Sequence, residues 1–106
     1  MKLKPVEYLP AAQVEAVESA VWYQERESGL GERFQVSLEL AEKLIRRNPL
    51  LGAPYYLDTR KWRVPDFPFN LIYREEPRKI LIVAVAHQAR RPGYWRKRIS
   101  SKKKDY

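Results

Sequence analysis

Three side chains that can move protons or bind phosphate occur close together near the end of the chain: His87, Arg90 and Tyr94. An imidazole can act as a general base because it titrates near neutral pH. A tyrosine can donate a proton if neighbouring arginines lower its pKa, and a guanidinium neutralises phosphate. These residues are the candidate catalytic groups if the protein is a nuclease. Two structural interpretations stay open: a strand-end histidine bound to backbone, and a tyrosine that packs against Pro92 and Trp95.

Further basic and aromatic residues could extend this set into one groove. Guanidinium groups neutralise phosphates and aromatic rings stack on bases, which is how many proteins bind RNA. The same residue types also form hot spots between proteins, so composition leaves both kinds of partner open. The candidate RNA-binding or partner-binding residues are Lys61, Arg63, Arg74, Arg91, Trp95 and Arg98.

Composition argues against several other chemistries. Cysteine is absent, which excludes a disulfide scaffold, thiolate zinc and a cysteine nucleophile. A single histidine argues against a histidine metal centre, and no cofactor or metal is expected. The acidic residues gather on predicted helices, where we expect solvated faces. The longest apolar run, residues 80–86, is too short to span a bilayer, and the first residues do not resemble a signal peptide, so we expect a cytoplasmic protein without a membrane partner.

The positive charge is concentrated at one end of the chain. The formal net charge is +8, and residues 90–106 hold eight basic side chains against one aspartate, whereas residues 1–89 are nearly neutral. Such a segment attracts phosphate or an acidic protein surface. No apolar residue interleaves the lysines at 102–104, which favours a solvated tail there. We therefore expect one domain over residues 1–98 and a basic C-terminal tail over residues 99–106.

A helical hairpin is predicted in the first half of the chain, after a short edge strand at residues 3–9. Pro10 suits the first turn of a helix, because its missing N–H has no helical partner there. The apolar stripe of the first helix, residues 11–28, consists of Val14, Val17, Ala20 and Val21, widened by Trp22 and Tyr23. The stripe of the second helix, residues 32–47, consists of Phe34, Leu38, Ala41 and Ile45. A short link with two glycines at residues 28–31 makes the helices antiparallel.

Three strands are predicted in the second half, at residues 61–64, 68–74 and 79–87, after a loop at residues 50–59. The first two alternate between apolar and polar residues, and the last is apolar on both faces. The order β-α-α-β-β-β predicts an α+β fold, an antiparallel sheet with the N-terminal α-helical hairpin packed on one face. The other face is expected to be partly open and to carry the basic groove.

Over residues 6–98, the motifs and their order resemble those of the RelE/ParE superfamily. Its members are toxins from type II toxin–antitoxin modules of the plasmid-stabilisation type. The matching motifs are Trp22-Tyr23, Gly29-Leu30-Gly31 with Phe34, Asn48-Pro49, Phe67-Pro68-Phe69-Asn70-Leu71-Ile72-Tyr73, and His87-x-x-Arg90-Arg91-Pro92-x-Tyr94-Trp95-x-x-Arg98. The resemblance implies a toxin of the RelE/ParE-like fold, held inactive by a small antitoxin encoded beside it.

The superfamily contains two activities. RelE-like members cut mRNA on the ribosome. They use arginines and a C-terminal tyrosine for this cleavage and need no metal. Tyr94 matches that tyrosine, but Asn70 and Gln88 stand where two of the arginines belong, and an amide carries no fixed positive charge. Arg90 or Arg91 could substitute for the second of these arginines. ParE-like members inhibit DNA gyrase and lack the nuclease residues. They often carry a Phe-Pro-aromatic motif, which is present here at residues 67–69. The resemblance therefore favours a ParE-like gyrase inhibitor, with a ribosome-dependent mRNA endonuclease as the alternative and a non-toxic nucleic-acid-binding module as a third class.

The resemblance also implies the character of the antitoxin. Antitoxins of this kind are folded dimers with a disordered acidic and amphipathic segment that orders on the toxin. We expect that segment to cover exposed parts of the hairpin and the basic groove, and the basic C-terminal segment to speed the encounter.

Overall fold

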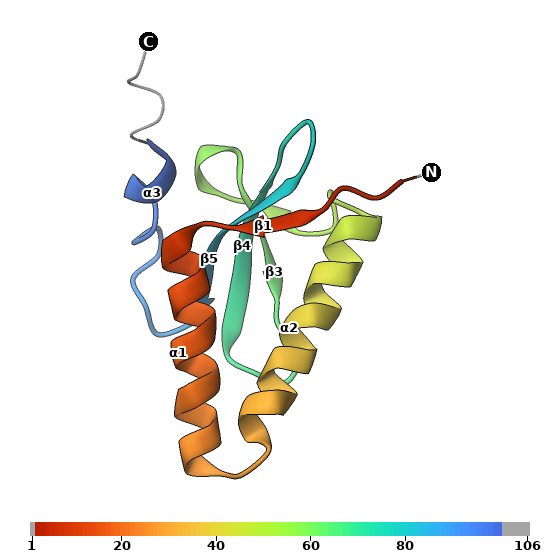
Figure 1. The fold of residues 1–106 in the computed structure, drawn as a ribbon. Helices are drawn as coiled ribbons and strands as arrows, with labels where there is room; N and C mark the ends of the chain where they lie inside the picture. Colours follow the sequence, from red (N-terminus) through yellow and green to blue (C-terminus); the bar gives the residue numbers. More distant parts are fainter. Residues whose placement is uncertain (1, 101–106) are drawn as a thin grey trace.

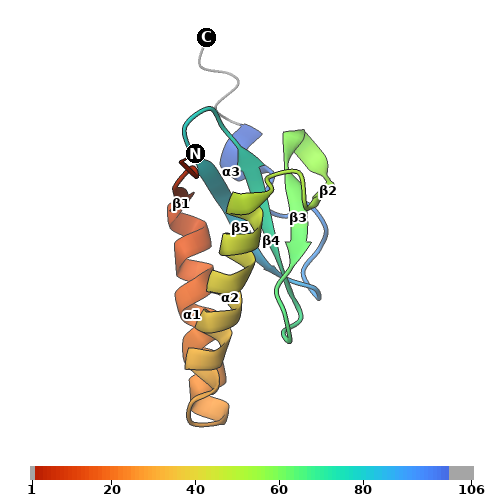
Figure 2. The same ribbon diagram turned by 90° about the vertical axis from the view of Figure 1, so that its right-hand side faces the viewer.

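A five-stranded sheet carries the helical hairpin on one face (Figure 1). The computed structural model describes residues 2–100. The elements are β1 (Val6–Tyr8), α1 (Pro10–Arg26), α2 (Leu30–Arg47), β2 (Ala53–Pro54), a 3₁₀ turn (Tyr56–Asp58), β3 (Arg60–Arg63), β4 (Phe69–Glu75), β5 (Ile80–His87) and α3 (Lys97–Ser100). Figure 2 shows the two long helices as one layer beside the sheet. The α+β class and the helical hairpin are therefore confirmed.

The sheet has the strand order β1-β5-β4-β3-β2. It is antiparallel from β2 to β5, as predicted, but β1 runs parallel to β5. The two strands are joined through the rest of the fold rather than by a tight turn, so their connection does not impose antiparallel pairing. The short strand β2 and the 3₁₀ turn lie in the segment predicted as a loop, and α3 was not predicted.

Close packing at the turn of the hairpin depends on glycine. Gly29 has a φ of +88° at the start of α2, in the left-handed region that glycine adopts without strain. The Gln24 side-chain oxygen accepts hydrogen bonds from the N–H groups of Gly29 and Gly31, both at 3.1 Å. A Cβ at Gly31 would lie 2.6 Å from the Ala20 carbonyl oxygen. The two helices can therefore approach closely only because residue 31 has no side chain.

The buried stripe of α2 is the predicted one. Phe34, Leu38, Ala41 and Ile45 lie in the core between the hairpin and the sheet. The ring of Phe34 packs against the rings of Tyr23, Phe67 and Phe69, with centroids 5.1–5.4 Å apart. This aromatic cluster joins both helices to the β3–β4 end of the sheet.

The predicted core stripe of α1 is confirmed at Ala20 and Tyr23 but is wrong for its valines. Val14, Val17 and Val21 are 50–51% exposed, whereas Ala12 and Ala20 are buried. Ala16 and Tyr23 also pack against the core. The alanines form a second stripe with helical spacing, and their small side chains let α1 lie close to β5 and α2. The valines therefore face away from the sheet.

The second face of the sheet is more covered than predicted. Trp95 and Ile99 are each 1% exposed and pack on Ile72 of β4 and on Leu81 and Val83 of β5. Ile99, which falls in the predicted tail, is therefore buried on the sheet, and the lysines predicted for the tail, at 102–104, lie outside the described residues. Within residues 2–100, no helix is both long and apolar enough to cross a membrane.

Candidate functional site

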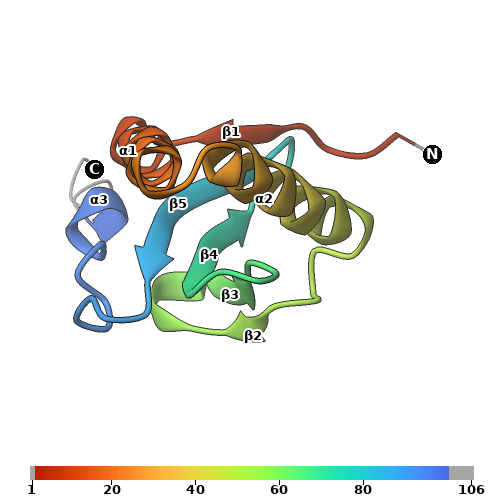
Figure 3. The same cartoon turned by 90° about the horizontal axis from the view of Figure 1, so that it is seen from below.

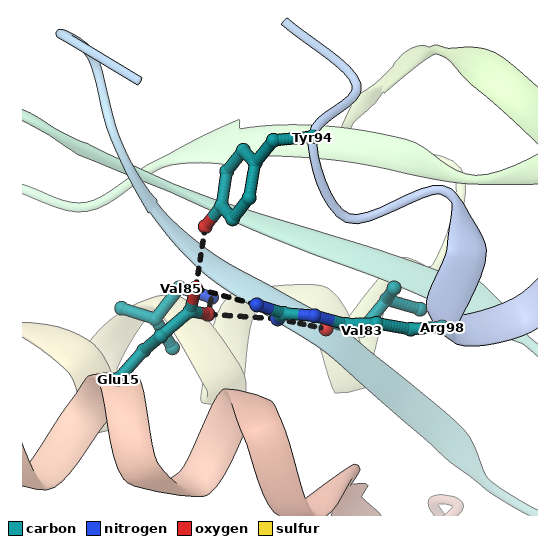
Figure 4. Close-up of polar contacts among 5 residues, drawn as sticks. All are labelled: Glu15, Val83, Val85, Tyr94 and Arg98. Carbon is teal, nitrogen blue, oxygen red and sulfur yellow. Dashed lines mark hydrogen bonds and ion pairs between the residues drawn. The ribbon is translucent and has the colours of Figure 1, made fainter. Parts of the chain in front are cut away.

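Glu15 of α1 joins the hairpin to the C-terminal segment, residues 88–99 (Figure 4). Figure 3 shows α3, at the end of this segment, on the same side of the molecule as α1. Its Oε2 accepts a hydrogen bond from the Tyr94 hydroxyl at 2.6 Å. The Arg98 guanidinium donates to both carboxylate oxygens, at 2.9 and 2.8 Å, and also to the Val83 carbonyl oxygen at 3.0 Å. The backbone N–H of Val85 donates to Oε1 at 3.0 Å. Four hydrogen bonds therefore converge on one carboxylate.

The electrostatics of this cluster fix the protonation of its members. Burial acts to raise the pKa of Glu15, but the hydrogen bonds from Arg98, Tyr94 and Val85 outweigh it and hold that pKa below its usual value. Burial and the hydrogen bond to Glu15 raise the pKa of Tyr94, against the weaker opposing effect of Arg98 and Arg90. The arginines therefore act to lower the pKa of Tyr94, but burial and Glu15 outweigh them, and the net pKa is raised rather than lowered. Its hydroxyl stays protonated and is committed to Glu15.

Sequence reasoning missed Glu15, because acidic residues on the helices were interpreted as solvated. Its side-chain partners Tyr94 and Arg98 are 79 and 83 residues away in the chain. No local pattern marks the residue, since its role depends on where the C-terminal segment returns to α1.

Two grooves meet at the end of β5. The larger, which we call the α1 groove, has a volume of about 520 Å³ and lies between α1 and the neighbouring ends of β4 and β5. Its lining residues are Glu15, Glu18, Ser19, Trp22, Tyr23, Pro68, Phe69, Val85, His87 and Arg90. Trp22 is 50% exposed, and the Arg26 guanidinium lies 3.7 Å from the centre of its ring. A large exposed aromatic side chain beside an apolar groove is typical of a protein-binding surface.

The smaller groove, of about 160 Å³, is the predicted basic groove. It brings together six of the nine predicted site residues: Lys61, His87, Arg90, Arg91, Tyr94 and Trp95. Asn70 also lines it, in the position where the resemblance leads one to expect an arginine. Arg90 stacks on the ring of Tyr94, with its guanidinium carbon 3.8 Å from the ring centre, and Lys61 lies 4.5 Å from the ring centre of Tyr55.

The other three predicted residues lie outside this groove. Arg63 donates from Nε to the Phe67 carbonyl oxygen at 3.1 Å. Arg74 forms an ion pair with Glu76 at 2.9 Å, near the opposite end of β4. Arg98 is held by Glu15.

Trp95 lines the basic groove but is a core residue. Its ring is buried against the second face of the sheet, so it is not free to stack on a base. Gly93, with a φ of +76°, provides the turn that brings the chain back onto the sheet. The predicted partner-binding role of Trp95 therefore does not fit its burial.

His87 is exposed at the end of β5, and its contacts match the structural interpretation. Its Nδ1 accepts a hydrogen bond from the Ala89 N–H at 2.9 Å, and its ring packs edge-on against Phe69. The exposed guanidiniums of Arg90 and Arg91 beside it give the groove the character of an anion-binding surface. Within residues 2–100, no three His, Cys, Asp or Glu residues cluster closely enough to hold a metal ion.

Comparisons with known proteins give one family match and one match of fold. A family model described as "ParE toxin of type II toxin-antitoxin system, parDE" matches residues 6–92. Among solved structures, the chain is similar to one from "Chromosomal ParDE TA system from P. aeruginosa", with a TM-score of 0.60 and 13% sequence identity. The alignment covers 80% of this chain and 96% of that one, and at this identity it shows a shared fold. No curated protein sequence matches the chain.

Proposed function

This chain belongs to the ParE toxin family of type II toxin–antitoxin systems, and from that premise we propose that it stops growth by inhibiting DNA gyrase until a cognate antitoxin neutralises it. Gyrase is a cytoplasmic target, so the proposal places the action of the toxin in the cytoplasm.

The state of Tyr94 supports gyrase inhibition over RNA cleavage. A metal-free nuclease needs a group that can give a proton to the leaving oxygen. The Tyr94 hydroxyl is bound to Glu15, and burial together with that bond raises its pKa. Asn70 adds no positive charge to the basic groove, and Arg98 is neutralised by Glu15. These contacts make Tyr94 a poor proton donor and leave the groove with less positive charge than Arg98 and an arginine at position 70 would give it, which supports gyrase inhibition.

One observation favours the alternative, a ribosome-dependent mRNA endonuclease. Lys61, Arg90 and Arg91 meet beside His87 in one groove, which is a suitable place for an RNA phosphate. Cleavage would then depend on His87 and on release of Tyr94 from Glu15.

The α1 groove supports the antitoxin part of the proposal. The antitoxin segment implied by the resemblance is acidic and amphipathic. Its apolar side chains would fill the groove beside Trp22, and its carboxylates would pair with Arg90 at the rim. The net charge of +8 on the toxin would speed this association at low salt.

Pulse labelling after induction of the chain without its antitoxin tests the choice of target. The proposal expects protein synthesis to continue for the first minutes while cells filament and report DNA damage. An immediate collapse of protein synthesis, abolished by His87→Ala, would instead establish the nuclease.

A further inference from the structure

The basic groove adjoins the 3₁₀ turn at Tyr56–Asp58, on the face of the sheet away from the hairpin. At this turn the Arg96 guanidinium carbon lies 4.9 Å from the ring centre of Tyr56, and the ring centres of Tyr56 and Tyr55 are 4.7 Å apart. Because Tyr55 lines the basic groove, the groove and the turn form one surface. We call this surface the cation–aromatic strip, and define it as Lys61, Arg90, Arg91 and Arg96 with the rings of Tyr55, Tyr56 and Tyr94.

The turn that presents two of these rings has an unusual backbone. Leu57 and Asp58 have φ angles of +58° and +62°, in the left-handed region that costs free energy for residues other than glycine. Hydrogen bonds close the turn, from the Tyr55 N–H to the Thr59 carbonyl oxygen at 2.8 Å and from the Thr59 hydroxyl to the Tyr56 carbonyl oxygen. Leu57 also packs on the buried residues of the second face. The fold therefore holds these two rings in place.

The cations of the strip carry charge that the fold does not neutralise. None of the four forms an ion pair within the described residues 2–100. Asp58 is an exposed carboxylate in the turn, so the strip and its turn keep four positive charges against one negative charge. Contact with a ring restrains Lys61, Arg90 and Arg96, which reduces the freedom that they lose when an anion binds.

The rings of the strip offer little free surface for stacking on a base. Each of the three tyrosine rings already has a cation over it. Tyr55 and Tyr94 are partly buried, and Tyr56, which is 42% exposed, packs against Tyr55. Single-stranded RNA is recognised largely by stacking of its bases on free rings. Duplex DNA keeps its bases stacked inside and presents closely spaced phosphates, which cations alone can bind.

We propose that the cation–aromatic strip binds the phosphate backbone of duplex DNA without reading its sequence. Among the helices of residues 2–100, only the four-residue α3 packs on this face, and it is too short to enter the major groove as a recognition helix. The biological role of this site rests on the proposed function. Gyrase acts on duplex DNA, and a toxin that contacts both the enzyme and its DNA stabilises the complex between them.

Fluorescence anisotropy with the full chain tests DNA binding without gyrase. The probes are two duplexes of unrelated sequence and a single-stranded RNA, each labelled and of the same length. We expect the two duplexes to bind with affinities within about twofold of each other, and both more tightly than the RNA.

A matched pair of double variants separates the strip from the net charge of the chain. Lys61→Gln with Arg91→Gln removes two charges from the strip, and Lys43→Gln with Arg33→Gln removes the same two residue types from exposed positions of α2. The strip variant should bind duplex DNA about tenfold more weakly, and two lost phosphate contacts should lower the slope of log K against log salt concentration by about 1.8. The α2 variant has the same net charge and should bind within about twofold of the wild type.

Three outcomes would overturn the proposal: no binding of either duplex, tighter binding of the RNA than of the duplexes, or equal effects of the two double variants. Circular dichroism checks each fold, and if the strip variant is unfolded, the single change Arg91→Gln at an exposed side chain decides, with Arg33→Gln as its control.

Trapping of cleaved DNA by purified gyrase then tests the link to the proposed function. The strip variant should need about tenfold more protein than the α2 variant for the same trapping. Equal trapping by the two variants would refute a part for the strip in gyrase inhibition. If the wild type binds duplex DNA through the strip but leaves gyrase unaffected, the DNA site stands and the proposed function fails.

Discussion

Replacing Glu15 by glutamine should release the C-terminal segment from α1. The side chains of Glu15 and Arg98 are only 16% and 20% exposed, so their ion pair is poorly screened by water. Glutamine has nearly the same volume as glutamate, but it has no charge and only one side-chain oxygen that accepts hydrogen bonds. The Arg98 guanidinium and one other donor therefore lose their hydrogen-bond acceptor. Charge-assisted hydrogen bonds contribute about 1.5–3 kcal/mol each, and part of that is lost. We expect unfolding free energy to fall by about 2–3 kcal/mol, or roughly 10–20 °C in Tm.

Urea unfolding followed by tryptophan fluorescence measures this loss, because the buried Trp95 lies in the C-terminal segment. Glu18→Gln is the matched control, since Glu18 is exposed and its loss should cost less than about 0.5 kcal/mol. A double-mutant cycle with Arg98→Met isolates the pair, and a coupling of about 1 kcal/mol or more is expected. If Glu15→Gln costs no more than Glu18→Gln, or if the coupling is absent, the cluster does not hold the segment.

Three further predictions concern stability and antitoxin binding. The pKa of Glu15 is lower in the folded state than in the unfolded state, so the charged carboxylate stabilises the fold above pH 4.5. Urea titrations should therefore show the largest difference in unfolding free energy between wild type and Glu15→Gln at neutral pH, and a smaller difference as the pH falls below 4.5. Gly31→Ala should lower the free energy of unfolding by about 2 kcal/mol or more, because its Cβ would lie 2.6 Å from a carbonyl oxygen of α1; an unchanged Tm would contradict this. Trp22→Ala should weaken binding of the cognate antitoxin at least about tenfold in calorimetry, whereas Val36→Ala should not.

The helices differ in how well their sequences predict burial. In α2, apolar residues occupy one side in a single stripe, and that stripe is buried as predicted. In α1, valines and alanines form two stripes, and hydrophobicity alone favours the valines. The alanines are buried instead, because a close approach of α1 to β5 needs small side chains. Which stripe faces the sheet depends on the partner surface, which local sequence does not contain.

The candidate site shows the same limit. The candidate residues from the last residue of β5 onward were predicted together, and His87, Arg90, Arg91 and Tyr94 do line one groove. The functions of Tyr94 and Trp95 depend on a chain reversal at Gly93 and on contacts with distant α1 and β4. An aromatic pair among arginines therefore suggested an exposed surface, whereas one ring is in the core and the other is bound to Glu15.

A supercoiling assay with purified gyrase tests the proposed function most directly. The wild-type chain should inhibit supercoiling or trap cleaved DNA, the addition of antitoxin should reverse the effect, and Tyr94→Phe should inhibit as the wild type does once its fold is confirmed. Unaffected gyrase, together with ribosome-dependent mRNA cleavage that Tyr94→Phe abolishes, would contradict the proposal and assign the basic groove to catalysis.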